Sequence, residues 1–375
     1  MRKSLLALVA AGLLTSVTLS ACDGGTEGAT GSDEATVSGG SEKVTGNDGI
    51  AVILPDTETD RWVNDDPKYL QAEFEKAGVP AQIFNAEGDE DEFKRIAKTA
   101  LDKGFKVLII ANHTAASAKA VIDDAHSRNI PVIDYDRLTL NGAADYYVSF
   151  DNEEVGRLQA KGLLSCLQQK GVTNPVIAEL NGSPADNNAH LFKTGYDTVL
   201  NAEFDNATAF KGPDQFVPDW KEDNAREIFA LMYKQFPNID GVLSANDGLG
   251  NAAIEVLKEK KRNGKVPVTG QDASLQGLQN ILTGDQCMTV YKDARKQAEA
   301  AAKLAVGLYK NEKQAVPDKI KDPESGLYIP FVKLAPQAIN IKNMKTAILD
   351  SKYVDVAELC TAEYRKACRS AKLIS

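Results

Sequence analysis

The chain has 375 residues, of which 43% are hydrophobic and 26% are charged, the composition of a globular protein long enough for two domains. It carries 43 basic and 53 acidic residues, a formal net charge of −10. An acidic chain lacks the clustered Lys and Arg that bind phosphate backbones, which argues against nucleic acid as a partner.

The N-terminus has the pattern of a secretory signal peptide. Arg2 and Lys3 supply positive charge, residues 5–19 are mainly apolar, and small residues precede Cys22. The apolar run is shorter than the about 20 residues of a membrane span. The Leu-Ser-Ala-Cys stretch at 19–22 resembles the bacterial lipobox, which implies cleavage before Cys22 and attachment of diacylglycerol to its sulfur. We therefore expect an exported chain that a lipid anchors at the outer face of the cytoplasmic membrane; an ordinary signal peptide with an incidental cysteine is the alternative.

Residues 23–48 consist of Gly, Ser, Thr, Asp and Glu with almost nothing apolar. Such a segment buries too little surface to offset its chain entropy, so we expect a flexible linker. A linker behind a lipid anchor suits a domain that is held near a membrane but turns freely.

The five cysteines fit export into an oxidising compartment. If Cys22 is lipidated, an even number remains, and we predict two disulfides, Cys360–Cys368 and Cys166–Cys287. A metal site is not expected, because no CxxC pair is present and the chain has only three His.

From residue 49 onward, short apolar runs alternate with helical patterns. The first series has expected strands at 49–54, 81–84, 107–110, 131–135 and 146–150, and expected helices at 67–77, 89–103 and 115–128. The second series has expected strands at 175–180, 207–210, 241–245, 266–270 and 287–291, and expected helices at 153–169, 188–200, 221–235, 250–261 and 274–282. A long helix at 294–310 and a strand at 329–332 follow. Two successive series predict two doubly wound α/β domains.

In parallel sheets of this kind, ligands bind at the carboxyl ends of the strands. No Gly-rich phosphate loop follows any expected strand. The residues that do follow the strands are carboxylates, amides, cations and two tryptophans: Asp56, Asp60, Arg61, Trp62, Asn112, His113, Asp136, Arg137, Asp186, Asn187, Asn188, Trp220, Asn246, Asp247, Gln271, Asp272 and Lys292. Planar polar groups bridge the hydroxyls of a sugar, and Trp rings cover its apolar C–H faces. The set favours a monosaccharide site.

Each of these residues also has a simpler interpretation when taken alone. Asn112, Asp186 and Asp272 are typical helix N-caps. Arg61 and Arg137 are typical of surface ion pairs, which contribute little. The two tryptophans are more typical of a hydrophobic core or of surface cover than of a ligand platform. A shared site is favoured because the residues recur at one edge of both expected sheets.

Several stretches together resemble the periplasmic-binding-protein type I family, and within it the D-xylose-binding proteins of bacterial importers. The matching stretches are Asp60-Arg61-Trp62, Asp134-Tyr135-Asp136-Arg137, residues 149–156, residues 182–189, Ala245-Asn246-Asp247, Gly270-Gln271-Asp272-Ala273 and residues 288–292. They span residues 50–340 in the family's order. The resemblance implies two Rossmann-like domains, a hinge that the chain crosses three times and a sugar between the domains.

The resemblance also implies which residues contact the sugar. They are Arg61, Trp62, Asp136, Arg137, Asn187, Trp220, Asn246, Asp272 and Lys292. The two Trp rings are expected to sandwich the pyranose. His113 stands where the family has other polar residues, and residues 248–251 depart from the usual small-residue run, which could alter the pocket wall. Xylose is favoured, and glucose, arabinose and galactose remain alternatives.

The family's crossings are expected near residues 149–151, 291–292 and 328–332. The expected divisions are a signal peptide at 1–21, a lipidated cysteine and linker at 22–48, an N-terminal domain at 49–149 plus 293–329 and a C-terminal domain at 150–292 plus 330–375. The resemblance implies a monomer without cofactor that delivers its sugar to the permease subunits of an ABC importer. Presentation of the sugar to a membrane sensor or chemoreceptor is an alternative. Two carboxylates in a cleft would also suit a glycosidase, but no Ser-His-Asp order or metal cluster accompanies them.

Overall fold

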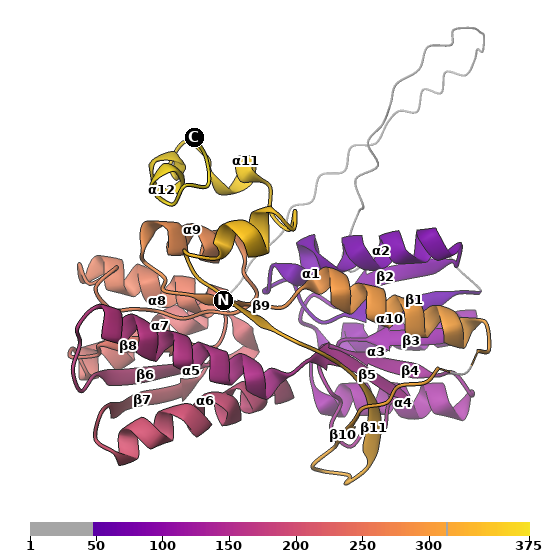
Figure 1. The fold of residues 1–375 in the computed structure, drawn as a ribbon. Coiled ribbons are helices and arrows are strands. Elements are labelled where there is room, and N and C mark those ends of the chain that lie inside the picture. The colour runs from indigo at the N-terminus through magenta and orange to yellow at the C-terminus, as the bar shows by residue number, and fades with distance from the viewer. Residues whose placement is uncertain (1–47, 313) are drawn as a thin grey trace, which may run out of the picture. The chain divides into compact units, whose positions relative to one another are not determined.

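The structure, a computed structural model, describes residues 48–312 and 314–375. The expected signal peptide, Cys22 and nearly all of the expected linker lie outside the described residues. The described helices and strands form two α/β lobes within one compact unit, called here the first lobe and the second lobe (Figure 1). A helix long and apolar enough to cross a membrane does not occur in the part of the chain that the structure describes.

The first lobe contains a seven-stranded sheet in the order β10-β11-β5-β4-β3-β1-β2. Its strands are β1 (Ile50–Leu54), β2 (Ala81–Asn85), β3 (Val107–Ile110), β4 (Val132–Tyr135), β5 (Tyr146–Phe150), β10 (Lys319–Lys321) and β11 (Tyr328–Leu334). All neighbouring strands are parallel except β10 and β11. The covering helices are α1 (Arg61–Asn64), α2 (Asp66–Ala77), α3 (Glu90–Lys103), α4 (Ala115–Ser127) and α10 (Ala294–Tyr309).

Strand β1 shows why the strands of the first lobe appear in the sequence as short runs of apolar residues. All five of its residues are buried, because helices cover both faces of the sheet. Ala51 and Ile53 pack into a cluster with side chains of α3 and α4. Ile50, Val52 and Leu54 pack on the opposite face with side chains of α2 and α10.

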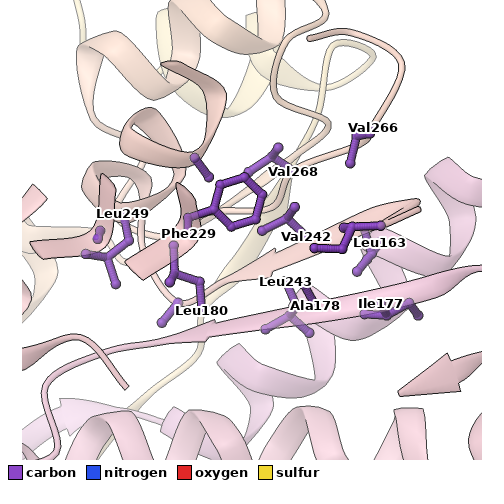
Figure 2. Packing of buried hydrophobic residues seen from close by; sticks show 14 of the residues in the cluster. Leu163, Ile177, Ala178, Leu180, Phe229, Val242, Leu243, Leu249, Val266 and Val268 are labelled. Atoms are coloured by element: carbon purple, nitrogen blue, oxygen red, sulfur yellow. The ribbon is translucent and has the colours of Figure 1, made fainter. Parts of the chain in front are cut away.

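The second lobe contains a three-stranded parallel sheet in the order β7-β6-β8 and a separate antiparallel pair of β9 and β12. The strands are β6 (Val176–Asn181), β7 (Phe210–Phe216), β8 (Gly241–Ser244), β9 (Thr289–Tyr291) and β12 (Gln337–Ile339). The helices are α5 (Asn152–Gln169), α6 (Asn187–Asp205), the 3-10 turn η1 (Pro218–Trp220), α7 (Glu222–Gln235), α8 (Asp247–Glu259) and α9 (Leu275–Thr283). Figure 2 shows part of the core, where Phe229 of α7 and Leu163 of α5 lie among side chains of β6 and β8.

Two strands expected in the second lobe differ from the structure. The strand expected at 207–210 is wrong, because α6 continues to Asp205, Ala207 takes a left-handed conformation with φ 55°, and β7 begins only at Phe210. The strand expected at 266–270 is reduced to a single bridge between Val242 and Val268. Proline at 267 has no N–H, and the N–H of Ser244 donates to the side chain of Thr269 instead of to a neighbouring main chain.

The chain passes between the lobes three times: between β5 and α5, between β9 and α10, and between β11 and β12. The third passage comes later than expected. Residues Phe331–Leu334 pair with Tyr147–Phe150 in the first-lobe sheet, so the expected domain boundary between 329 and 330 falls inside β11 and is wrong. The predicted fold class is confirmed: two parallel-sheet α/β lobes are joined by a hinge of three crossings.

Residues 340–375, called here the C-terminal cap, follow the third passage and pack on the second lobe (Figure 1). They contain a π-helical turn η2 (Lys345–Leu349), α11 (Val356–Leu359) and α12 (Arg365–Ser370). Side chains of the cap form a small core with α9, Tyr291 of β9 and Ile339 of β12. The sulfurs of Cys360 and Cys368 lie at disulfide distance in this core, with their Cα atoms 5.9 Å apart.

Candidate functional site

A cavity lies between the two lobes, at the carboxyl ends of β1, β4, β6, β8 and β9. Its walls are formed by Thr59, Arg61, Trp62, Asp136, Arg137, Asp186, Asn188, Phe192, Trp220, Asn246, Gln271, Asp272 and Lys292. This is the position at which open α/β sheets bind their ligands.

Eight of the ten side chains expected to contact a sugar line this cavity. The exceptions are Asn187 and His113. Asn187 is the first residue of α6 and is half-exposed, whereas Asn188 lines the cavity, because successive side chains on a helix point about 100° apart. The structure thus favours Asn188 over Asn187 as a residue of the cavity wall, and the expected sugar contact of Asn187 stays a prediction. His113 lies half-buried in the loop before α4 and is not among the lining residues.

Asp136 is the centre of a buried network of charges. Its Oδ1 accepts hydrogen bonds from Arg61 Nη1 at 2.9 Å and Lys292 Nζ at 3.1 Å, and its Oδ2 accepts one from Asn188 Nδ2 at 3.1 Å. Burial alone would raise the pKa of Asp136, but the charges of Lys292, Arg61 and Arg137 outweigh it and hold the pKa far below its usual range. The ionised carboxylate thus joins the first lobe to α6 and to the second crossing.

The backbone of Asp136 is also held in an uncommon conformation. Its φ is 64°, in the left-handed region that costs a non-glycine residue about 1–3 kcal/mol. Three side chains donate to its carbonyl oxygen: Tyr147 Oη at 2.9 Å, Ser149 Oγ at 2.8 Å and Asn188 Nδ2 at 3.0 Å. These bonds offset the strain and fix the carboxylate against the cavity.

All three nitrogens of the Arg61 guanidinium donate hydrogen bonds to neighbouring side chains. Its Nε and Nη2 each donate to Asp66 at 2.7 Å, and Nη2 also donates to Gln297 Oε1 at 2.8 Å. Its guanidinium carbon lies 4.5 Å from the centre of the Trp62 ring. Arg61 therefore supports the ring of Trp62 and the charge of Asp136 within the cavity wall.

Arg137 and Asp186 connect the two lobes on the other side of the cavity. Arg137 Nε lies 3.0 Å from Asp186 Oδ2, and its Nη1 donates to the carbonyl of Asn112 at 3.0 Å. Asp186 also accepts a hydrogen bond from Trp220 Nε1 at 3.1 Å and caps α6 through the N–H of Asn188. Burial raises the pKa of Asp186 although the charge of Arg137 opposes it.

The two tryptophan rings face the same cavity from different lobes. Trp62 and Trp220 are only 2% and 6% exposed. Trp220 lies directly over the backbone of Gly182: a Cβ at that position would lie 1.9 Å from Trp220 Cη2, so only glycine leaves room for the ring. The edge of Phe192 supports the ring at a centroid distance of 6.4 Å. The expected stacking of both rings on a pyranose stays a prediction.

Besides Arg137 Nε, which has no hydrogen bond but is ion-paired with Asp186, three buried polar atoms of the cavity wall have no hydrogen-bond partner among the described residues: Trp62 Nε1, Gln271 Oε1 and Asp272 Oδ1. Lys292 Nζ lies 3.8 Å from Asp272 Oδ1, beyond hydrogen-bond distance. Burial raises the pKa of Asp272, although the charges of Lys292 and Arg61 oppose it. One donor and two acceptors are thus presented together, a pattern that ligand hydroxyls can satisfy.

The loop that presents Gln271 and Asp272 is strained and is held from behind. Asp272 has φ 93° and Ala273 has φ 58°. The N–H of Asp247 donates to the carbonyl of Gln271 at 3.0 Å, and Asp247 Oδ2 accepts the N–H of Ser274 at 2.8 Å. Burial raises the pKa of Asp247 to about 7. Asp247 therefore positions the loop without lining the cavity.

With this geometry in place, comparison with known proteins identifies the family. The family model described as "Periplasmic binding protein domain" matches residues 50–313. The chain belongs to the periplasmic-binding-protein family.

Relatives of this periplasmic binding protein cover most of its length. It is 33% identical to a D-xylose-binding periplasmic protein of Haemophilus influenzae, over 80% of this chain and 88% of the relative. It is 31% identical to a D-xylose-binding periplasmic protein of Escherichia coli, over 83% of this chain and 92% of the relative. A solved ABC transporter solute binding protein from Clostridium phytofermentans with bound β-D-glucose has a TM-score of 0.76 and 26% identity, over 83% of this chain and 99% of that one.

Five residues that line the cavity of this periplasmic binding protein are not among the sugar contacts that the resemblance implies: Thr59, Asp186, Asn188, Phe192 and Gln271. Asp186, Asn188 and Gln271 follow expected strands, so their positions carried a signal. Phe192 lies four residues after Asn188, on the same face of α6. Residues 248–251 do not line the cavity; they form the first turn of α8, and a Cβ at Gly248 would lie 2.8 Å from Glu222 Oε1. The N–H of Leu249 in this turn donates to Oδ1 of Asn246, which does line the cavity, at 2.9 Å.

Proposed function

We propose that this periplasmic binding protein captures a monosaccharide in the cavity between its lobes. The observation that carries the proposal is the group of three unpartnered buried atoms, on Trp62, Gln271 and Asp272, in a cavity that also contains Trp220. Hydroxyls both donate and accept, and so can satisfy all three atoms, while the indole rings can cover the apolar faces of a sugar.

The charges of the site favour a neutral ligand. Arg61, Arg137 and Lys292 are each paired with at least one buried carboxylate. An anionic ligand would need a cation that is free to pair with it, since an unpaired buried charge is costly. A neutral polyol or aldose makes no such demand.

D-xylose is the sugar we propose first. Two relatives that are 33% and 31% identical are described as D-xylose-binding proteins. Another aldose is the alternative, because a multiple sugar-binding periplasmic receptor of Rhizobium radiobacter is 30% identical over 83% of this chain, and the Clostridium phytofermentans structure contains glucose. Xylose and glucose differ by one hydroxymethyl group, so both present the same ring hydroxyls to the cavity.

We propose further that the protein is exported, is anchored through Cys22 and delivers its sugar as a monomer to the permease subunits of an ABC importer. Presentation of the same sugar to a membrane sensor or chemoreceptor is an alternative destination. The protein binds its ligand without transforming it. A Cys22→Ala variant should be released from the membrane fraction, and retention of that variant on membranes would contradict the anchor.

Calorimetric titration of the mature protein with D-xylose, D-glucose, L-arabinose and D-galactose tests the proposed ligand. One aldose should bind with a dissociation constant of about 1 μM or tighter. Trp220→Ala should weaken that affinity by about 100-fold, and Trp220→Phe should weaken it less because a ring remains. Absence of binding by every aldose, unchanged affinity in Trp220→Ala, or hydrolysis of aryl glycosides would each contradict the proposal.

The two cysteine pairs are proposed to be disulfides. The structure places Cys166 of α5 at disulfide distance from Cys287, with their Cα atoms 6.4 Å apart, in addition to the pair in the C-terminal cap. Thiol titration of the denatured, unreduced mature protein should find no free thiol. Detection of two or more free thiols would contradict the pairing.

A further inference from the structure

The C-terminal cap lies beyond the residues that the family model matches, which end at 313. Its core is continuous with α9 and with residues of β9 and β12, so the cap is part of the second lobe. Within this cap, one side chain reaches a residue of the first lobe. Tyr353 Oη donates to Asp65 Oδ2 at 2.9 Å.

Tyr353 is firmly placed on the second-lobe side. Its ring packs against Tyr291 at a centroid distance of 4.7 Å, directly before the second crossing. Its N–H donates to the carbonyl of Ile348 at 3.0 Å, where the chain turns back after η2. Its hydroxyl also lies 3.5 Å from the carbonyl oxygen of Asp272, which lines the cavity. The hydroxyl is therefore presented toward the first lobe by an ordered backbone.

On the first-lobe side, Asp65 is coupled to the cavity wall through α1. It lies between α1 and α2, and its N–H donates to the carbonyl of Arg61 at 3.1 Å. The next residue, Asp66, holds the guanidinium of Arg61 through two hydrogen bonds. Asp65 thus adjoins the four-residue helix that carries both Arg61 and Trp62.

The hydrogen bond from Tyr353 to Asp65 is charge-assisted at neutral pH, which makes it stronger than a bond between neutral groups. Burial and the neighbouring charge of Asp66 raise the pKa of Asp65 to about 6, and the bond from Tyr353 opposes that rise. At pH 7.5 the Asp65 carboxylate is ionised, and an ionised acceptor strengthens a hydrogen bond.

We propose that Tyr353 is a latch: its bond to Asp65 holds the lobes together and slows release of the sugar. This inference rests on the proposed sugar-binding function. Tyr353 does not line the cavity and acts through Asp65 and α1, so it is a positioning residue. An interaction that exists only when the lobes are together favours the closed state and the bound ligand by the same factor.

The test is the rate of sugar dissociation, measured by stopped-flow fluorescence at pH 7.5 with the aldose that binds best in the titration panel. Tyr353→Phe removes only the hydroxyl and should raise the dissociation rate constant by about tenfold, while the association rate constant changes less than about threefold. Asp65→Asn should act in the same direction. The double variant should be no worse than the more affected single variant, because both remove one interaction. Tyr364→Phe, in the same cap, is the matched control and should leave both rates unchanged.

The outcomes separate the latch from simpler roles. A dissociation rate in Tyr353→Phe equal to that of the wild type overturns the latch while sugar binding stands. A fall in the unfolding temperature of the free protein, with parallel loss of association rate, also overturns it, since that indicates a role in folding alone. If the wild type binds no aldose, the proposed function fails instead, and the latch is then judged by small-angle X-ray scattering of the free protein. A larger radius of gyration in Tyr353→Phe than in the wild type supports the latch, and an equal radius overturns it.

Discussion

The two walls of the cavity differ in how the carboxylate at the centre of each wall is paired. The first-lobe wall centres on Asp136, whose carboxylate is hydrogen-bonded to Arg61, Lys292 and Asn188 and has a strongly lowered pKa. The second-lobe wall centres on Asp272, whose Oδ1 has no hydrogen bond among the described residues and whose pKa is raised by burial. One carboxylate is fully satisfied by protein groups, and the other is not.

This difference suggests that the first-lobe wall positions the ligand and that the second-lobe wall selects which ligand binds. A wall whose central carboxylate is already paired loses little freedom when a ligand binds, so it serves as a preorganised surface. A wall with unpaired buried acceptors gains hydrogen bonds only from a ligand that donates to them, and it discriminates against analogues that do not. Substitutions in the first-lobe wall should therefore reduce stability and binding together, whereas those in the second-lobe wall should reduce binding alone.

Asp136→Asn should have the largest effect. It leaves the buried cations around it without their shared anion, and breaking a buried ion pair costs about 3–5 kcal/mol. Denaturant unfolding of the free protein should show that loss, and titration should show at least 100-fold weaker sugar binding. Asp102→Asn is the control, because Asp102 pairs with Lys98 and Arg128 at the surface, where such pairs contribute about 1 kcal/mol or less. An unfolding free energy for Asp136→Asn equal to that of the control would contradict the preorganised first-lobe wall.

Asp272→Asn should weaken sugar binding by about 30-fold and leave the stability of the free protein unchanged or slightly higher. The reason is that burial already disfavours the charged form of Asp272, so removal of the charge relieves a cost. Titration and denaturant unfolding measure the two effects separately. A loss of stability as large as that in Asp136→Asn would show that the two walls do not differ.

The contrast between the walls could not be predicted from the sequence. Asp136 and Asp272 each follow a strand-like run, and their neighbours in the chain do not reveal their environments. Asp136 is paired because Lys292 and Asn188 approach it from more than 50 positions away, and such contacts leave no local pattern. The sequence predicted more successfully which residues line the cavity, because parallel strands of one sheet end at one edge.

The distinction between local sequence patterns and contacts between distant residues also explains which helices and strands were predicted. Strands β1 to β5 of the first lobe were predicted within about two residues because burial on both faces makes continuous apolar runs, as in β1, whereas the short and mostly exposed edge strand β10 was not predicted. The strand expected at 266–270 failed because a side chain of Thr269 replaces a main-chain partner, which periodicity cannot reveal. The short helices of the C-terminal cap, α11 and α12, span four and six residues and are too short to show a helical period.

Gln271→Met tests the second-lobe wall further and should weaken sugar binding less than Asp272→Asn does. The substitution removes the unpartnered Oε1 while it keeps the length of the side chain. Sugar affinity should fall by about tenfold, the contribution of one hydrogen bond to a neutral group, and the free protein should be as stable as the wild type or more so. Unchanged affinity in calorimetric titration would show that this acceptor faces no ligand hydroxyl.

The smallest expected effect is a dependence of stability on pH that both lobes share. Burial raises the pKa of Asp134 in the first lobe and of Asp247 in the second lobe to about 7, above the ordinary value of 3.8. The folded state therefore binds more protons than the unfolded state between those values, so stability falls as pH rises through this window. Asp136 adds no slope there, because it is ionised in both states. The unfolding temperature should be higher at pH 5.5 than at pH 8, and Asp247→Asn should flatten the profile; an unfolding temperature that increases with pH would contradict the raised pKa values.

The contact between Gly182 and the ring of Trp220 has a consequence for engineering. Gly182 does not line the cavity, yet the absence of its Cβ sets how deeply the indole can sit in the second lobe. Even an alanine at this position would force the ring to move and would change the shape offered to every ligand. A mutant library for new ligand preference that varies only the cavity-lining positions would leave this determinant fixed, so Gly182 belongs among the positions to randomise.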